Sequence, residues 1–549
     1  MMSKNHLNNR RHFLKSLLAG SAAGAFGSVG QLALMQQAMA ATTPQFSDYK
    51  AMVCVFLYGG NDSFNMLIPT GSDEASGYDA YAASRGDLSV ANNALALGEG
   101  KLGRGSANPY YDGGSDASAY LKGLYPMAQS NGFELGVNGV MPELAQLMTQ
   151  SKASVVANVG NLVEKVTRAE IAAETARLPL FLFAHNHQQR ALQTGQADNL
   201  NAIGWAGRIA DNWADINNGS LMGLNISYAG NDRMLIGANS SPLVFSPGTP
   251  PRIYDMQFEE WSSHQDRLSL YKALTGKENS SPTGFVSFDH SNTFKSSDPF
   301  RSLFASKASN SLDVFELVDK AWNEHNINYT STDSYGNELF SVPSASDLGL
   351  STNVRGNFIR QLESVAKMVD MGAKDAFQSG GYKRQIFMVS LGGFDTHSNQ
   401  ATEHPLLLRE LSLGLSKFQA AMEELGHANQ VTSFTMSDFG RTLGNNGDGT
   451  DHAWGAHHLV MGGDGQNSSG NLMGGQLLGQ LPNMQIDGAD DYSNKGRIIP
   501  TTSQDQLNAS LCRWFGVDEA LMPTIFPNLA NFSTSSSDFE SAYLTGLYA

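Results

Sequence analysis

The sequence has little cysteine, little basic charge and no long apolar run beyond its N-terminus. Only Cys54 and Cys512 occur among 549 residues, which excludes a disulfide scaffold and a cysteine-rich zinc site. Asp and Glu outnumber Lys and Arg by 52 to 36, and this acidic balance argues against nucleic acid or anionic lipid as a partner. No later stretch reaches about eighteen consecutive apolar residues, so we predict no membrane span in the mature chain.

The first forty residues predict an export signal. Arg10 and Arg11 precede Phe-Leu-Lys, a weakly apolar Ala- and Gly-rich run follows to about Leu34, and Ala38-Met39-Ala40 offers a cleavage site. This order resembles a twin-arginine (Tat) signal, whereas the run is too short and too polar for a membrane anchor. We expect a periplasmic or exported protein that passes through the Tat translocase. Its mature part carries 32 basic and 52 acidic residues, a net charge of −20.

The export prediction bears on the two cysteines. In an oxidising compartment Cys54 and Cys512 could pair. Because each lies in an apolar run typical of a strand or a helix, the sequence favours two buried free thiols.

Apolar runs and helical spacing predict an α/β fold with parallel strands and helices packed on the sheet. Residues 404–426 show apolar positions at helical spacing, and 353–378 form a second amphipathic stretch. The strand–helix–strand unit around 404–426 implies parallel pairing with a right-handed crossover. The predicted buried strands are residues 51–58, 153–160, 385–391, 431–436 and, less clearly, 457–461.

We expect residues 41–549 to form one elaborated domain with two long insertions. The first, about 70–135, is rich in Gly, Ser, Asn and Ala, a composition typical of a long surface loop. The second, about 215–345, contains a polar stretch, 275–299, that predicts a linker or flap. A Gly-x-Gly-x-x-Gly match at 98–103 follows no predicted strand, so it does not indicate a dinucleotide site.

Polar clusters follow three of the predicted strands, at residues 59–63, 392–400 and 437–442. In open α/β sheets, ligands bind beyond the carboxyl ends of the strands. The chain then continues into a stretch rich in Asp and His, and six of the eleven histidines of the mature chain fall between 397 and 458. We therefore place the candidate site at this edge of the sheet.

Carboxylates and imidazoles on short Gly-rich loops favour a divalent metal such as Zn²⁺, Mn²⁺ or Ca²⁺. Arg441 is a candidate for holding an anionic group by paired hydrogen bonds. The same Asp and Asn residues are also ordinary turn residues, and the histidines also suit a hydrogen-bonded scaffold. His185 and His187 form a second cluster that fits either a wall of the same cleft or the start of a helix. The candidate ligands here are Asp395, His397, Asp451, His452 and His457.

Six motifs together resemble a large bacterial family catalogued as domain of unknown function 1501 (DUF1501), whose members typically carry Tat signals. The resemblance covers about residues 48–530. The motifs are FLYGGND at 56–62, GWAGR at 204–208, GGFDTHSNQ at 392–400, SDFGRT at 437–442, GTDHAWGAHH at 449–458 and GRIIPTT at 496–502.

The resemblance implies a fold like that of the alkaline phosphatase and sulfatase superfamily, a doubly wound, mostly parallel α/β sheet flanked by helices and built around a metal centre. Asp62 matches the superfamily's metal-binding Asp after the first strand, and Asp438 is a weaker ligand candidate. Ser63 is a fallback nucleophile. By the same resemblance, the further metal ligands are Asp395, His397, Asp451, His452 and His457.

Two functions follow from these features. The first is an exported metal-dependent hydrolase of phosphate or sulfate esters, acting on a small anionic or saccharide-ester substrate. The second is a non-catalytic periplasmic or cell-envelope protein on the same fold, paired with a co-exported protein. Family members often carry Ser where this chain has Asn186, and an amide is a poor nucleophile, which favours the second function. The clustered His and Asp residues favour the first.

Overall fold

The computed structural model describes residues 44–97, 120–127, 134–213, 216–217, 223–248, 313–314, 316–348, 350, 352–374, 376–377, 381–535 and 539–549. Residues 1–46 and 47–549 form separate units, and the second is described below. The predicted signal at 1–40, the Gly-x-Gly-x-x-Gly match and the polar stretch 275–299 lie outside the described residues. Within the described ranges, no helix combines the length and the apolar character needed to cross a bilayer.

Residues 47–549 form a mixed α/β fold around a nine-stranded sheet, which confirms the predicted fold class at that level. Most neighbouring strands are parallel, but β12 runs antiparallel to both of its neighbours. In spatial order the strands are β13 (Leu477–Gly479), β5 (Ala153–Gly160), β12 (Ala456–Gly462), β9 (Val431–Ser437), β1 (Lys50–Tyr58), β8 (Arg384–Gly392), β6 (Asn225–Ser227) and β7 (Leu243–Val244), with β14 (Thr502–Ser503) beside β5.

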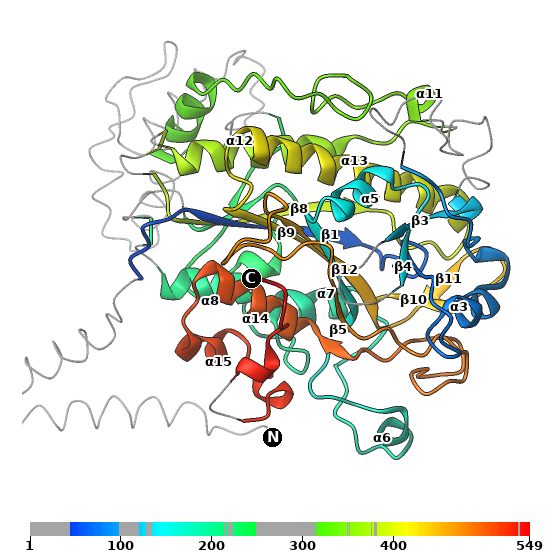
Figure 1. The fold of residues 1–549 in the computed structure, drawn as a ribbon. Coiled ribbons are helices and arrows are strands. Elements are labelled where there is room, and N and C mark those ends of the chain that lie inside the picture. Colours follow the sequence, from blue (N-terminus) through cyan, green and yellow to red (C-terminus); the bar gives the residue numbers. More distant parts are fainter. Residues whose placement is uncertain are drawn as a thin grey trace, which may run out of the picture. The chain divides into compact units, whose positions relative to one another are not determined.

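Helices cover both faces of the sheet (Figure 1). Strand β1 is buried throughout 51–57, as expected for a parallel strand with helices above and below it. One face carries α5 (Pro142–Thr149), α12 (Asn357–Ala373) and α13 (Gln400–Glu424), and the other carries α7 (His185–Thr194), α8 (Trp205–Asn212), α14 (Gln504–Phe515) and α15 (Met522–Ile525). Helix α13 begins four residues before its predicted start, because its first turn is polar and its apolar spacing begins only at His404.

The segments expected as insertions are partly built into the core. Helix α3 (Tyr78–Arg85) buries Tyr81 and Arg85, and its residues pack with Phe64 and Leu443. Strand β3 (Leu124–Met127) joins β2 (Leu67–Pro69) and β4 (Leu135–Asn138) in a three-stranded sheet. Strands β6 and β7, within 215–345, extend the large sheet beside β8. A composition rich in small polar residues therefore does not place these segments outside the fold.

The remaining elements are short. A hairpin of β10 (Arg441–Asn445) and β11 (Thr450–His452) follows β9. The other short helices are α6 (Arg168–Ala172) and α11 (Ala345–Leu348), with 3₁₀ turns at Gly86–Leu88, Arg233–Leu235, Glu519–Leu521, Leu529–Phe532 and Glu540–Ala542.

Candidate metal centre

The sheet brings three polar loops to one edge. Strands β9, β1 and β8 are adjacent and parallel, so the loops after Ser437, Tyr58 and Gly392 leave the sheet side by side. Two glycines after β1 allow these loops to pack closely. Both have positive φ, and a Cβ on Gly59 would lie 2.4 Å from the backbone nitrogen of Asp395.

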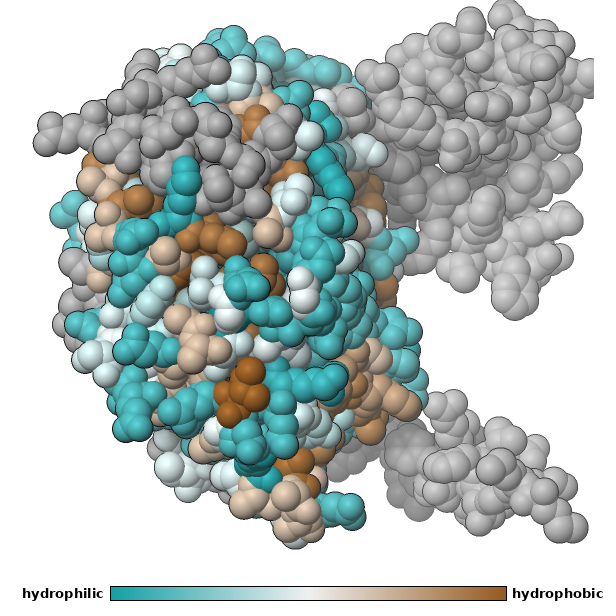
Figure 2. Space-filling model, turned by 90° about the vertical axis from the view of Figure 1, so that its right-hand side faces the viewer, coloured by the Kyte–Doolittle hydropathy of each residue, from teal (hydrophilic) through white to brown (hydrophobic). Residues whose placement is uncertain are grey.

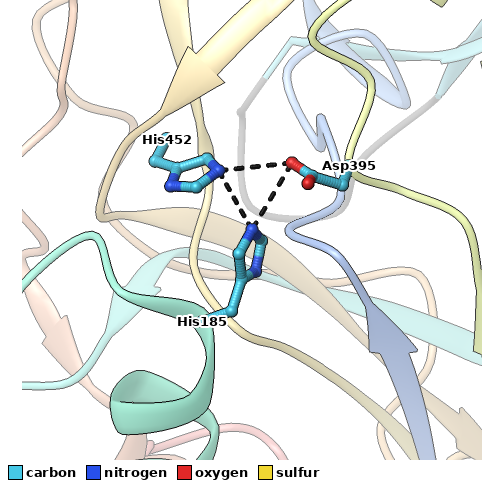
Figure 3. Close-up of side chains that lie close together, drawn as sticks. All are labelled: His185, Asp395 and His452. Atoms are coloured by element: carbon cyan, nitrogen blue, oxygen red, sulfur yellow. Dashed lines mark hydrogen bonds and ion pairs between the residues drawn. The ribbon is translucent and has the colours of Figure 1, made fainter.

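Four potential donor atoms converge where these loops meet. Asp395 Oδ1 lies 3.2 Å from His452 Nε2, 3.1 Å from His397 Nε2 and 3.4 Å from His185 Nε2. His452 Nε2 is also 2.8 Å from His397 Nε2 and 3.0 Å from His185 Nε2. Figure 3 shows His185, Asp395 and His452 pointing toward one another, and the three are grouped closely enough to hold one metal ion.

Each imidazole is fixed by an oxygen acceptor at its other nitrogen. His185 Nδ1 lies 2.6 Å from Asp438 Oδ2, and His397 Nδ1 lies 3.3 Å from Asp451 Oδ1. His452 Nδ1 lies 2.8 Å from the carbonyl oxygen of Phe183. Because a carbonyl can only accept, His452 carries its proton on Nδ1 when neutral and presents a lone pair on Nε2. Oxygen acceptors of this kind orient the histidine ligands of metal sites.

The surroundings shift the pKa values of the group's members in different directions. Burial lowers the pKa of His452, which keeps it neutral. Burial raises the pKa of Asp395, but the hydrogen bond and charge of Arg441 outweigh this effect and leave that pKa lowered. The hydrogen bond to Asp438 raises the pKa of His185. A carboxylate oxygen and imidazole lone pairs held this close repel one another unless a cation or a shared proton lies between them.

Residues 376–518 match the family model described as a protein of unknown function (DUF1501). Over this region the chain is similar to the DUF1501 family. No curated protein matches the chain. The DUF1501 region contains β8, α13, β9 and the β10–β11 hairpin, and with them Asp395, His397 and His452; His185 lies outside it.

Arg441 organises the loops of the DUF1501 region. Its Nε and Nη groups donate to the carbonyl oxygens of Gly60, Thr450, Gly59 and Phe394, all at 2.9–3.0 Å, and to Asp395 Oδ1 at 2.5 Å. Its side chain is fully buried. Since these bonds use the guanidinium along both edges, the structure places Arg441 as a support for Asp395 and not as the expected anion clamp.

Asp438 and Asp451 lie behind the histidines. Asp438 is buried, and its Oδ2 also accepts from Gln189 Nε2 at 2.9 Å. The ring of Phe439 packs against His185 and His452, with centroids 4.7 Å apart in each case. Both carboxylates, expected as ligands, therefore contact the rear nitrogens of imidazoles.

Asp62, Ser63 and His457 lie apart from the group, in the buried interior. Asp62 forms an ion pair with Arg85 and accepts from Gln400, with both charged side chains fully buried. Ser63 Oγ accepts from the backbone N–H of His457 at 2.7 Å. His457 Nδ1 accepts from the backbone N–H of Asn158 at 3.1 Å. The sequence does not predict the pairing of Asp62 with Arg85, because Arg85 lies in a segment whose composition is typical of a surface loop.

The two histidines of the second cluster differ in position. His185 is the first residue of α7 and faces the group. It therefore both starts a helix and lines the candidate site, the two alternatives that the sequence left open. His187 instead packs on the ring of Phe181, with centroids 4.3 Å apart.

The Phe183 carbonyl, which bonds His452 Nδ1, is a contact that cannot be predicted from the sequence, since any residue type supplies a carbonyl. Phe181 and Phe183 both have positive φ, at 52° and 70°, which is uncommon for aromatic residues.

The group opens to solvent on one side. The side chain of Asp395 is 47% exposed and that of His452 is 23% exposed. Strand β1 runs toward the right of Figure 1, and Figure 2 views the molecule from that side. Hydrophilic residues predominate on the described part of this face, with hydrophobic residues in small separate groups.

Proposed function

We propose that this DUF1501 protein is an exported metal-dependent hydrolase of phosphate or sulfate esters, on a fold like that of the alkaline phosphatase and sulfatase superfamily. The observation that carries the proposal is the convergence of the Nε2 atoms of His185, His397 and His452 on Asp395 Oδ1. Imidazole nitrogens with one carboxylate oxygen suit Zn²⁺ and Mn²⁺. Ca²⁺ prefers all-oxygen sites, so this donor set argues against it.

The spacing of the donors also supports a metal. Zn²⁺ binds histidine nitrogen and carboxylate oxygen at about 2.0–2.2 Å, so neighbouring donors in a tetrahedral site lie about 3.3 Å apart. The three contacts of Asp395 Oδ1 and the two of His452 Nε2 with the other donor atoms measure 2.8–3.4 Å, and His185, Asp395 and His452 form the group that could hold one ion. A divalent metal held there would polarise an ester oxygen and balance the negative charge that develops on it.

The residues around the centre have separable tasks. Asp438, Asp451 and the Phe183 carbonyl orient the imidazoles, and Arg441 orients the Asp395 carboxylate. The exposed side of the centre admits substrate and water. Because Ser63 is buried and already bonded to the His457 N–H, we assign the attack on phosphorus or sulfur to water.

The alternative is a non-catalytic periplasmic or cell-envelope protein that binds a saccharide ester or a co-exported protein. The burial of Ser63 also supports this reading, since the superfamily's usual hydroxyl nucleophile then has no counterpart at that position. A metal centre would serve here as a binding determinant.

Metal content tests the proposal. We expect mature protein purified without chelator to carry about one equivalent of Zn, Mn or Fe by elemental mass spectrometry. His452→Ala should remain folded and lose the metal, while the control His187→Ala should keep it, because His187 packs on Phe181. Full occupancy in His452→Ala would contradict the proposal.

Turnover then separates the two functions. We expect the metal-loaded protein to hydrolyse generic phosphate or sulfate esters, with the activity lost in His452→Ala. A protein that binds metal but turns over neither class of ester would instead support the non-catalytic alternative.

A further inference from the structure

Arg441 and Arg497 both bond residues of the candidate metal centre, and their hydrogen bonding differs. The guanidinium of Arg441 donates hydrogen bonds to four carbonyl oxygens and to Asp395 Oδ1. Arg497 donates from Nε to the carbonyl oxygen of His452 at 2.9 Å. Among the described residues, neither Nη group of Arg497 has a hydrogen-bond partner and no carboxylate forms an ion pair with it. Arg497 therefore has donors left for a ligand.

Arg497 is held directly beside a ligand residue. Its guanidinium lies over the ring of Phe183, 4.3 Å from the ring centroid. The carbonyl of the same Phe183 binds His452 Nδ1, so one residue both orients His452 and supports Arg497. Phe183 is fixed in turn by an edge contact with Tyr492, with centroids 5.4 Å apart.

The turn that carries Arg497 is rigid. The buried carboxylate of Asp491 accepts backbone N–H groups from Asp487, Ser493, Gly496 and Arg497, all at 2.9–3.1 Å. These bonds fix the backbone before any ligand arrives, which lowers the cost of ordering the side chain on binding.

We propose that Arg497 binds the anionic phosphate or sulfate group of the substrate beside the metal centre. This inference rests on the proposed function. The Nη groups form a planar fork that matches the oxygens of a tetrahedral anion. The mature chain carries a net charge of −20 and repels anions at long range, so a positive group beside the centre has to hold the anion locally. Arg497 thus takes the role that the sequence assigned to Arg441.

Inorganic phosphate is the probe that tests this assignment. Its binding to the metal-loaded protein is measured by calorimetry for the wild type, Arg497→Met, Arg497→Lys and Arg190→Gln. Arg190 is an exposed residue of α7, so Arg190→Gln controls for the loss of one positive charge. We expect phosphate to bind about 10- to 100-fold more weakly to Arg497→Met, with a smaller loss in Arg497→Lys and none in Arg190→Gln.

Metal content, measured on the same samples, separates this inference from the proposed function. Full metal occupancy with weaker phosphate binding in Arg497→Met supports the assignment. If Arg497→Met loses metal, Arg497→Lys decides, because it keeps a donor near the His452 carbonyl and must still bind phosphate more weakly at full occupancy. Equal phosphate affinity in the wild type and the metal-loaded Arg497 variants overturns the inference alone. A wild type that takes up no metal overturns both proposals.

Discussion

At the residue scale, the property that matters most for each imidazole is the partner of its Nδ1 atom. Asp438, Asp451 and the Phe183 carbonyl fill this role for His185, His397 and His452. A histidine whose rear nitrogen is bonded to an oxygen acceptor presents its other nitrogen in a fixed direction. This arrangement supports the proposed metal centre, because histidines that only share a surface need no such acceptors.

Asp438→Asn tests the rear carboxylate. The substitution keeps the volume but removes the charge that faces His185, so we expect metal affinity to fall about 10- to 100-fold. Competition with a chelator measures this affinity. Asp464→Asn, an exposed position bonded to Asn429, serves as the control. Unchanged affinity in Asp438→Asn would show that this carboxylate does not act on the centre.

Asp62→Ala tests the interior pair. The substitution leaves the Arg85 guanidinium buried without its partner, and losing one member of such a pair costs about 3–5 kcal/mol. We expect urea unfolding to show this loss of stability, while each folded molecule still binds the metal. If the folded Asp62→Ala variant instead lost its metal, this result would indicate that Asp62 is a metal ligand.

The sequence predicts which loops meet more readily than which atoms meet. Asp395, His397 and His452 were singled out because they follow strands or cluster with other histidines. The histidine pattern is the same whether an aspartate coordinates a metal or supports an imidazole, so Asp438 and Asp451 could not be separated from ligands. Asp62 follows a strand just as Asp395 does, and only its buried partner Arg85 distinguishes it.

At the element scale, helix α14 begins with a buried carboxylate. Asp505 is the second residue of the helix, where the backbone dipole favours a negative charge. Burial nevertheless raises the pKa of Asp505 to about 8, against the lowering effect of Arg208. The folded protein therefore holds Asp505 protonated at pH values where the unfolded chain ionises it.

This difference predicts a stability that falls as pH rises. Between the unfolded pKa of about 3.9 and the folded value of about 8, the native state binds one more proton, which costs at most about 1.4 kcal/mol per pH unit. Asp505→Asn cannot ionise. We therefore expect the melting temperature of this variant, relative to that of the wild type, to increase between pH 5 and pH 8. Asp87→Asn, which removes an exposed carboxylate, should show no such gain. Parallel melting curves for wild type and Asp505→Asn would contradict the prediction.

The elements themselves were predictable where the sequence pattern is simple. The apolar runs at β1, β5, β8 and β9 give their strands directly, because burial on both faces requires continuous apolar residues. The direction of β12 was not predictable, since strand orientation depends on the connection through the β10–β11 hairpin. Short strands such as β6 carry too few residues for a pattern.

At the scale of the whole molecule, the centre exists only in the folded chain. Its donors come from the start of α7, the loop after β8 and the end of β11, which span residues 185 to 452. A metal site assembled from distant segments couples binding to folding, because the unfolded chain offers no preformed set of ligands. Export in the folded state, as the predicted Tat signal implies, would therefore carry the metal across the membrane already bound.

Replacing Arg10 and Arg11 by Lys tests this order of events. We expect the twin-lysine precursor to remain in the cytoplasm, whereas Lys4→Gln, which leaves the arginine pair intact, should be exported normally. Because the donors converge on folding, the retained precursor should contain the same metal, in the same amount, as the exported mature protein. Export of the twin-lysine chain would contradict the Tat assignment. A retained precursor that is folded but metal-free would instead show that the centre is loaded only after export.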